Sequence, residues 1–431
     1  MLNKIIIFGL LISGITAQGY ALYDCVQIAL EGKKTVLSAE LGVSSAEKGL
    51  TGSYSGLLPS LQASTGASRQ QYSNTTTIFN NNYNRLSAGI SLNQTIYDGG
   101  RSFNQVRQAK LNLHIAKLNQ RSTKIQVIQN VIKSYYGLLQ AQKLLNVSEK
   151  NLEMSEQQIS LVKKQFDLGV VRRTDLLKAE VSVGQARVDV LNRKANLENA
   201  RRVLFNDMGL QDFGQSITAI DDEWLAATIP TSADIMELLK TRNPSLLVSQ
   251  AQINLGDLNY KISKGLRLPS LNSSVNYSAN GENSEELMNA IKDDWSLGMN
   301  VTLSMPIYTG HNLSIQQQQA KLSRQQSEYD YTTLLNNLRV QTELIRKSLN
   351  NYAEIIPLNK AIVASAEEDL KFVRERYSLG SATILEVLDA QVSLIRSNST
   401  LINTIHDARM QEASLKALLG TLDLDYQIEE D

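Results

Sequence analysis

The chain has 431 residues, and its 43 Lys and Arg residues balance its 43 Asp and Glu residues, so the formal net charge at pH 7 is zero. This balance excludes the strongly basic surface of a nucleic-acid-binding protein, and we expect no nucleic-acid partner. The single cysteine, Cys25, excludes an internal disulfide framework, and we expect its thiol to be buried and inert. The chain contains six prolines, a low number that favours long uninterrupted helices.

Residues 1–21 have the pattern of a secretory signal peptide. Lys4 supplies the short basic region, residues 5–15 form an apolar core that is too short to span a bilayer, and Gly19-Tyr20-Ala21 offers small residues at both positions that cleavage needs. Beyond residue 21 the sequence has no apolar run of about 18 residues, so we expect no membrane-spanning helix. An exported chain can still enter a membrane as β-strands.

The remaining chain is a tandem duplication. The segment 166–177 returns as 377–388, and adding 211 to the number of Gly169 gives Gly380. A period this long predicts two whole structural units, each with a helix, two strands and a long helical hairpin in the same order. The predicted repeats comprise residues 22–221 and 222–431, and their first helices comprise roughly residues 24–53 and 232–264. Asn243-Pro244 predicts a bend in the second of these helices.

Two stretches in each repeat alternate apolar residues with small polar ones. The four candidate strands lie near residues 61–67, 86–93, 271–279 and 295–305. Such alternation over about ten residues is typical of membrane strands that face a wet lumen, although half of a soluble sandwich has the same pattern. If the strands span a membrane, several chains must share one sheet, because an open sheet edge is not tolerated in lipid. The loops 73–84 and 280–294 are polar and suit an outside surface.

The segment from Gly100 to Phe166 contains no proline and predicts a helix roughly 100 Å long. An apolar stripe with a seven-residue repeat comprises Val131, Leu138, Leu145, Leu152, Ile159 and Phe166. A stripe of small residues beside it comprises Ser134, Ala141, Ser148, Ser155 and Val162. This repeat indicates left-handed supercoiling with closely packed neighbours, although an ordinary soluble coiled coil also fits. Gly169 and Gly380 are predicted at the tips of the helical hairpins.

No catalytic arrangement is recognisable in the sequence. The three histidines, His114, His311 and His406, lie apart and have no Cys or His neighbours at ligand spacing. No glycine loop of the phosphate-binding kind is present. We therefore expect no enzymatic activity, no metal and no cofactor.

Three segments resemble the TolC family of bacterial outer-membrane efflux channels. They are Tyr377-x-Leu379-Gly380-x-x-Thr383-Ile384-x-Glu386-Val387-Leu388-Asp389-Ala390, Leu418-Leu419-Gly420-Thr421-Leu422 and Gln94-x-Ile96-Tyr97-Asp98-Gly99-Gly100. The resemblance implies a mainly α fold with membrane β-strands, in which a homotrimer forms a twelve-stranded transmembrane β-barrel in outer-membrane lipid and a periplasmic α-barrel of coiled-coil hairpins. It implies a passive exit duct for drugs, toxins or secreted proteins.

The resemblance also implies partners, namely a periplasmic membrane-fusion adaptor and an inner-membrane transporter of the RND or ABC type, the latter as in type I secretion. The adaptor would contact the hairpin tips, which comprise Leu168, Gly169, Val170, Leu379, Gly380 and Ser381. The strand-to-helix junctions comprise Tyr97, Gly99, Tyr308 and Gly310. A periplasmic coiled-coil scaffold without a membrane pore is the competing interpretation.

In the family, polar links among an Asp, a Tyr and an Arg hold the periplasmic entrance shut. Asp175 and Tyr377 match the first two positions, but Ala382 stands where the arginine is expected. We hypothesise that Arg172 or Arg173 supplies the missing cation, against the alternative that both are solvated charges at a helix start. Two further residues, Glu386 and Asp389, match acidic positions that ring the constricted lumen.

Overall fold

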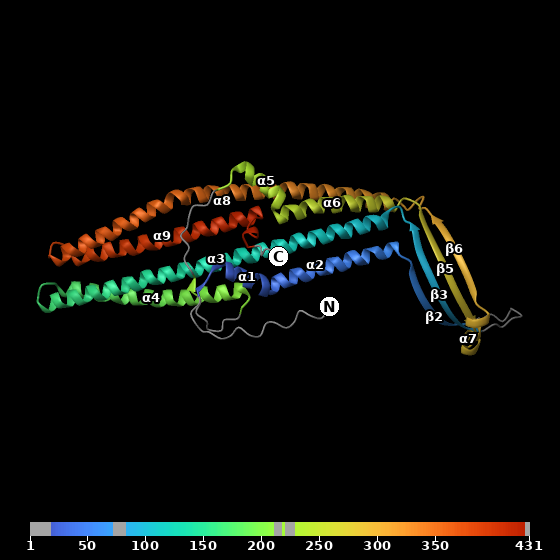
Figure 1. The fold of residues 1–431 in the computed structure, drawn as a ribbon, viewed down its shortest axis with the longest axis horizontal. Coiled ribbons are helices and arrows are strands. Elements are labelled where there is room, and N and C mark those ends of the chain that lie inside the picture. The colour runs from blue at the N-terminus through green and yellow to red at the C-terminus, as the bar shows by residue number, and fades with distance from the viewer. Residues whose placement is uncertain (1–18, 72–82, 211–217, 220–228, 427–431) are drawn as a thin grey trace. The chain divides into compact units, whose positions relative to one another are not determined.

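The computed structural model of the chain describes residues 19–71, 83–210, 218–219 and 229–426 (Figure 1). Most of the predicted signal peptide, and much of the segment that joins the two repeats, lies outside the described residues. Gly19–Tyr20 form β1, which pairs in parallel with β4 (Thr218–Ala219). Among the described helices, none combines the length and the hydropathy that crossing a bilayer requires.

In the described residues, the two repeats have the same elements in the same order, apart from η1, α7 and η2. The first repeat contains α1 (Leu22–Gly32), α2 (Lys34–Ser53), η1 (Tyr54–Leu57), β2 (Ser60–Gln70), β3 (Tyr83–Tyr97), α3 (Arg101–Asp167) and α4 (Arg173–Met208). The second contains α5 (Ser232–Arg242), α6 (Pro244–Gly265), β5 (Ser270–Gly281), α7 (Ser284–Asp293), β6 (Ser296–Ser304), α8 (Asn312–Ser378), α9 (Ile384–Leu419) and η2 (Leu424–Tyr426). Because α3 and α8 both have 67 residues and α4 and α9 both have 36, the duplication is kept in the fold.

The first helix of each repeat is broken into two, without a signal in the first repeat and at the predicted bend in the second. Lys33 separates α1 from α2, and Asn243 separates α5 from α6, each with extended backbone angles. The break at Asn243 has a local cause, since the residue before a proline disfavours the helical conformation. The break at Lys33 has no such signal in the sequence.

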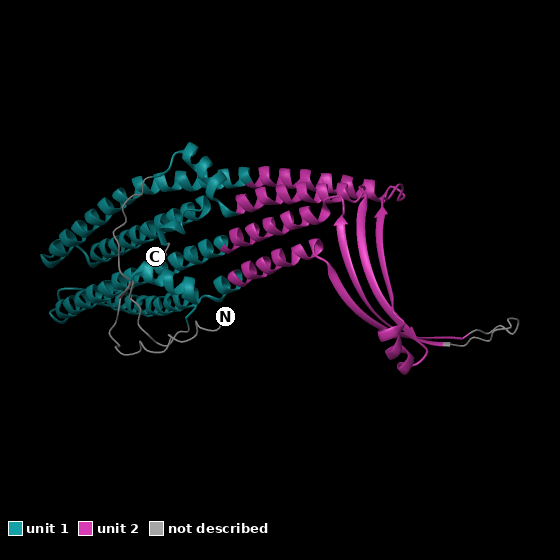
Figure 2. Ribbon diagram, turned by 45° about the vertical axis from the view of Figure 1, so that its right-hand side comes forward, with its two compact units in different colours: residues 1–39, 121–244, 335–431 teal, residues 40–120, 245–334 magenta. Residues whose placement is uncertain are grey.

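The chain forms two compact units, and each unit takes segments from both repeats (Figure 2). Unit 1 comprises residues 1–39, 121–244 and 335–431. Unit 2 comprises residues 40–120 and 245–334.

Unit 2 contains an antiparallel sheet with the strand order β2-β3-β5-β6. The register places Leu61 opposite Leu92, and Val275 opposite Met299, so the apolar residues of all four strands share one face. The opposite face carries mainly Ser, Asn, Gln, Thr and Gly. The apolar face comprises Leu61, Ala63, Ala67, Leu86, Ala88, Ile90, Leu92, Leu271, Val275, Tyr277, Ala279, Leu297, Met299, Val301 and Leu303. The predicted alternation is therefore confirmed, and β2 and β6 each have one unpaired edge.

Unit 1 has an apolar core where α1, α3 and α4 meet. Val26, Tyr135, Leu138 and Leu204 are almost fully buried in it. Cys25 lies in the same core, as predicted, and burial raises the pKa of its thiol to about 12. The stripe of small residues on α3 is also buried, which confirms that neighbouring helices approach it closely. Its buried members are Ser134, Ser148, Ser155 and Val162.

Candidate functional site

The tip between α3 and α4 is a tight helix end built around a glycine. Gly169 has a φ of +75°, which glycine adopts without a Cβ clash. Its N–H donates to the Phe166 carbonyl at 2.9 Å, and the Val170 N–H donates to the Gln165 carbonyl at 2.8 Å. This pair of bonds is the Schellman arrangement, which satisfies carbonyls that the helix end leaves free.

The tip between α8 and α9 repeats this geometry. Gly380 has a φ of +74°, and its N–H donates to the Tyr377 carbonyl at 3.0 Å. The Ser381 N–H donates to the Arg376 carbonyl at 2.8 Å. The predicted glycine-tipped hairpins are therefore confirmed at both positions.

Both tips present apolar side chains to solvent. Leu168 is 79% exposed and Leu379 is 82% exposed, and Val170 is also exposed. Isolated apolar side chains are common on protein surfaces, but three of them at two matching tips form a surface suited to an apolar partner.

The helices that return from the tips begin with an acidic residue bound to the turn. At the start of α9, the Thr383 hydroxyl accepts a hydrogen bond from the Glu386 N–H at 3.3 Å, and Glu386 Oε1 accepts one from the Thr383 N–H at 3.0 Å. The Thr383 hydroxyl also donates to Glu386 Oε1 at 3.0 Å, and the two hydrogen bonds that this carboxylate accepts hold the pKa of Glu386 below its usual range. At the start of α4, Asp175 Oδ2 accepts from the Arg172 N–H at 3.4 Å. Both acids therefore cap helices.

Tyr377 is buried beneath the second tip. Its hydroxyl donates to Gln165 Oε1 on α3 at 2.9 Å, so it ties the end of α8 to the end of α3. Burial raises the pKa of Tyr377, and the nearby negative charge of Asp175 raises it further. The hydrogen bonds of the two side chains go to different partners, Gln165 for Tyr377 and the Arg172 N–H for Asp175, so a direct link between Asp175 and Tyr377 stays a prediction. Gln165 was not predicted as a site residue, because it lies outside both heptad stripes.

The cation nearest to Glu386 comes from α8. The Arg376 guanidinium lies 3.5 Å from Glu386 Oε2, and its Nη2 donates to the Ser381 carbonyl at 3.0 Å. Sequence reasoning missed Arg376. Within the part of the chain that the structure describes, Arg172 and Arg173 are exposed and no carboxylate pairs with them, so the hypothesis that one of them closes the entrance stays a prediction. Asp389 is exposed one helical turn beyond Glu386.

The two hairpins are joined above the tips by a buried polar contact. Gln391 on α9 is only 2% exposed, and its Nε2 donates to Asn151 Oδ1 at 2.6 Å and to Ser155 Oγ at 2.9 Å. A groove of about 680 Å³ adjoins this contact and has apolar side chains from α4 and α9 on its walls. These side chains include Leu177, Val181, Leu385 and Val392.

The junction between β3 and α3 is fixed by a glycine and a cap. Gly99 has a φ of +72°, and a Cβ there would lie 2.4 Å from the Gly265 carbonyl oxygen, so no larger residue fits. Asp98 Oδ2 accepts hydrogen bonds from the Ser102 N–H at 2.8 Å and from its hydroxyl at 2.6 Å. Burial opposes ionisation of Asp98, but these bonds and the charge of Arg101 outweigh it and lower the pKa. Tyr97 is exposed.

The corresponding junction before α8 is more open. Gly310 has a φ of +60° and has no atom within 4 Å of the place where a Cβ would stand. The next residue, His311, has a φ of +67°, which is uncommon for a residue with a side chain. Its ring lies 5.7 Å from the ring of Tyr308, which is exposed.

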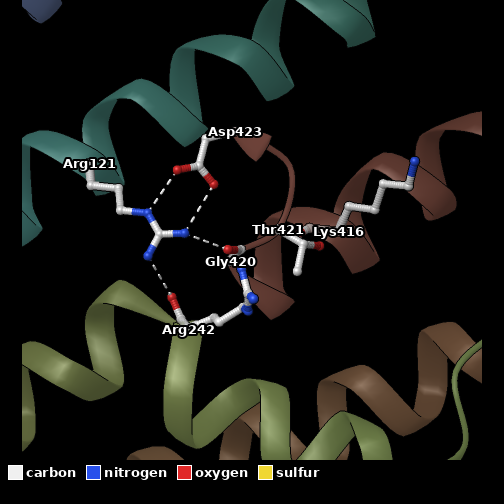
Figure 3. A network of polar contacts seen from close by, with 6 residues as sticks. All are labelled: Arg121, Arg242, Lys416, Gly420, Thr421 and Asp423. Atoms are coloured by element: carbon white, nitrogen blue, oxygen red, sulfur yellow. Dashed lines mark hydrogen bonds and ion pairs between the residues drawn. The ribbon is translucent and has the colours of Figure 1, made fainter. Parts of the chain in front are cut away.

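A network around Arg121 holds the end of α9 (Figure 3). The Arg121 guanidinium pairs with Asp423 through two contacts, at 2.7 and 3.1 Å. It also donates to the Gly420 carbonyl at 2.7 Å and to the Arg242 carbonyl at 3.3 Å. One side chain of α3 thus joins the last residue of α5 to the Gly420 cap of α9 and to Asp423, which follows it.

Comparison with known proteins gives consistent matches. The sequence model of the family described as "Outer membrane efflux protein" matches residues 25–210 and 235–421. The chain is 25% identical over 423 residues to the outer membrane protein TolC of Vibrio cholerae serotype O1, covering 96% of this chain and 93% of that protein. It is 23% identical over 341 residues to the cation efflux system protein CusC of Escherichia coli strain K12, covering 78% and 73%.

Solved structures have the same fold. The open-state MtrE outer membrane channel of Neisseria gonorrhoeae superposes with a TM-score of 0.81 at 18% identity, over 94% of this chain and 91% of that chain. The CmeC outer membrane channel of Campylobacter jejuni superposes with a TM-score of 0.82 at 17% identity, over 95% and 87%.

Proposed function

Because the chain belongs to the outer membrane efflux protein family, we propose that it works as a homotrimer in which three chains share one membrane-spanning sheet and one periplasmic tunnel of helices. The chain is an efflux channel of the bacterial outer membrane with a long periplasmic portion. Family membership favours this channel over a periplasmic scaffold without a pore.

The observation that carries the proposal is the sheet of unit 2. One of its faces carries the apolar residues of all four strands, as contact with lipid requires. Its other face carries mainly small and polar residues, as a water-filled lumen requires. Its edge strands β2 and β6 each leave one row of backbone N–H and C=O groups unpaired. In lipid such groups must be paired, so we propose that β2 of one chain pairs with β6 of the next. The number of chains, three with twelve strands in all, is what the resemblance to the family implies.

The periplasmic entrance lies at the two hairpin tips. Tyr377 and Gln165 form a hydrogen-bonded link between the ends of α8 and α3, with the charge of Asp175 near Tyr377, beneath tips whose turns are formed at Gly169 and Gly380. Opening the entrance requires the α8–α9 hairpin to move relative to the α3–α4 hairpin, which breaks this link. The passage is passive, because the chain has no energy-binding motif.

An inner-membrane transporter of the RND or ABC type supplies the energy, and a periplasmic adaptor connects it to the channel. The exposed Leu168, Val170 and Leu379 are the contacts that we assign to the adaptor, and the groove between α4 and α9 offers further apolar side chains on the same two hairpins. Drugs, toxins or secreted proteins leave through the duct. We further propose that the chain itself catalyses no reaction.

Membrane extraction and electrophysiology test the proposal together. Outer membranes should release the protein only with detergent, as a species that runs on gels as a trimer until it is heated. The purified protein should form stepwise conductances in planar bilayers. A water-soluble monomer without conductance would overturn the proposal. Co-purification with an adaptor and a transporter tests the partners separately, and repeating it after Leu168→Ser with Leu379→Ser tests the assigned contacts.

A further inference from the structure

The segment between β5 and β6 contains a helix where the sequence predicts a polar loop. This helix, α7, lies at the strand end opposite the junction with α3 (Figures 1 and 2). Since the long helices are periplasmic, this end of the sheet faces the outside of the cell. The helix therefore stands at the level of the outer leaflet.

The start of α7 is fixed firmly against the end of β5. Asn283 Oδ1 accepts a hydrogen bond from the Glu286 N–H at 2.9 Å, and Glu286 Oε2 accepts one from the Glu282 N–H at 2.9 Å. At Gly281, a Cβ would lie 2.4 Å from the Leu287 nitrogen, so the helix starts in direct contact with the strand. The helix is thus part of the folded sheet domain.

The helix lies on the apolar side of the sheet. Ala279, which belongs to the apolar face, is only 1% exposed, and Ala290 of α7 is buried with it. The Tyr277 hydroxyl, on the same face, donates to the Ile291 carbonyl at 2.6 Å. Because that face is the one turned to lipid, α7 lies on the outside of the pore wall and not in its lumen.

One edge of α7 leaves apolar side chains uncovered. Met288 is 59% exposed, and Ile291 is also exposed. Trp295, which follows the helix, is 50% exposed, and its ring lies 5.6 Å from the ring of Tyr277. This edge is continuous with the exposed apolar residues of β6, which begin at Leu297. Polar residues occupy the other side of the helix, namely Glu285, Asn289, Lys292 and Asp293.

We propose that α7 is an interfacial helix that anchors the channel in the outer leaflet, with Met288 and Ile291 among the acyl chains and Trp295 near the headgroups. We assign lipid as the partner of this apolar edge, because the edge continues the membrane-facing surface of the strands. The inference rests on the proposed placement of that sheet in the membrane. An amphipathic helix with one apolar edge and one charged edge is suited to this boundary.

Site-directed fluorescence in proteoliposomes tests the inference on the full chain. Cys25→Ser removes the single native thiol, and Met288→Cys or Asn289→Cys then places one polarity-sensitive dye on the apolar or on the polar edge of α7. We expect the dye at 288 to emit at shorter wavelength, to be quenched several-fold more strongly by nitroxide-labelled phospholipid, and to be protected from aqueous iodide. The dye at 289 should show the opposite pattern.

A third label distinguishes failure of this inference from failure of the proposed function. Met299→Cys places the dye on the apolar face of β6, where lipid nitroxide should quench it whether or not α7 is interfacial. Quenching at 299 but equal behaviour of 288 and 289 would overturn the interfacial helix alone. Protection of the dye at 288 from iodide without quenching by lipid would mean that protein covers this edge of α7, and this result would also overturn the interfacial helix. Absence of lipid quenching at 299 would overturn the membrane placement and the inference with it.

Discussion

Four glycines in this chain have the same role at a helix end, yet the structure predicts different costs for replacing them. Gly420 ends α9 with a φ of +67°, and a Cβ there would lie 2.3 Å from the Arg242 carbonyl oxygen. Gly380 ends α8 with a φ of +74°, and no atom lies within 4 Å of its Cβ position. Comparing Gly420→Ala with Gly380→Ala therefore separates the steric cost from the backbone cost.

The backbone cost is common to both variants, because alanine in the left-handed region costs about 1–2 kcal/mol. The steric cost applies to Gly420→Ala alone. A carbonyl oxygen at 2.3 Å must move by about 1 Å, and overpacking of this kind costs about 1–3 kcal/mol. The same carbonyl accepts from Arg121 at 3.3 Å, so its movement also weakens the network around that side chain. Gly209→Ala should fall between the two, since its nearest neighbour is the Lys33 Cα at 3.1 Å.

The measurement is the free energy of unfolding in detergent with urea, together with the temperature at which the gel-resistant oligomer dissociates. The expected order of destabilisation is Gly420→Ala, then Gly209→Ala, then Gly380→Ala. Equal losses at Gly420 and Gly380 would refute the reasoning, because they would mean that the close approach to Arg242 contributes nothing.

Three other predictions concern the junction and the entrance. Asp98→Ala should lower the free energy of unfolding by about 1 kcal/mol, because the cap of α3 is lost. Folding lowers the pKa of Asp98, so the stability difference between variant and wild type should be complete above about pH 4 to 5 and should vanish at lower pH. Urea titrations at a series of acid pH values measure this difference. Tyr377→Phe removes the bond to Gln165, worth about 1 kcal/mol, and should raise uptake of large antibiotics by intact cells, whereas unchanged uptake would count against the polar link. Arg376→Gln should strengthen block of the pore by trivalent cations added on the periplasmic side, and Asp389→Asn should weaken this block. Single-channel recordings measure both effects. If both variants behave like the wild type, neither residue lies at the lumen.

The long elements of this fold were predictable because their patterns repeat many times. The heptads of α3 and the glycines that follow α3 and α8 lie where the sequence places them, since dozens of residues support the same period. The break at Lys33 was not predictable. Its backbone packs against Gly209, which is far away in the sequence, and no proline marks it.

The strands of the sheet were predictable from the sequence, but the short helix between β5 and β6 was not. Even β2, which the sequence predicts near residues 61–67, keeps its alternation in the structure. By contrast, α7 has ten residues and four apolar ones, too few for a helical period to stand out among polar neighbours. Its contact with Ala279 and Tyr277 decides its position, and that contact is tertiary.

The duplication explains which acids of the entrance serve the fold and which are free for function. Asp175 and Glu386 are equivalent, because 175 plus 211 is 386, and both bind the first turn of a returning helix. Each repeat needs such an acid for its own folding, so its presence at the entrance is no sign of a role in the lumen. Asp389 is different, since 389 minus 211 is 178 and the equivalent residue is Lys178. A residue that the other repeat replaces with the opposite charge is not required by the hairpin. Asp389 is therefore the acid that we expect to face permeating cations, while Glu386 is held by Thr383 and Arg376.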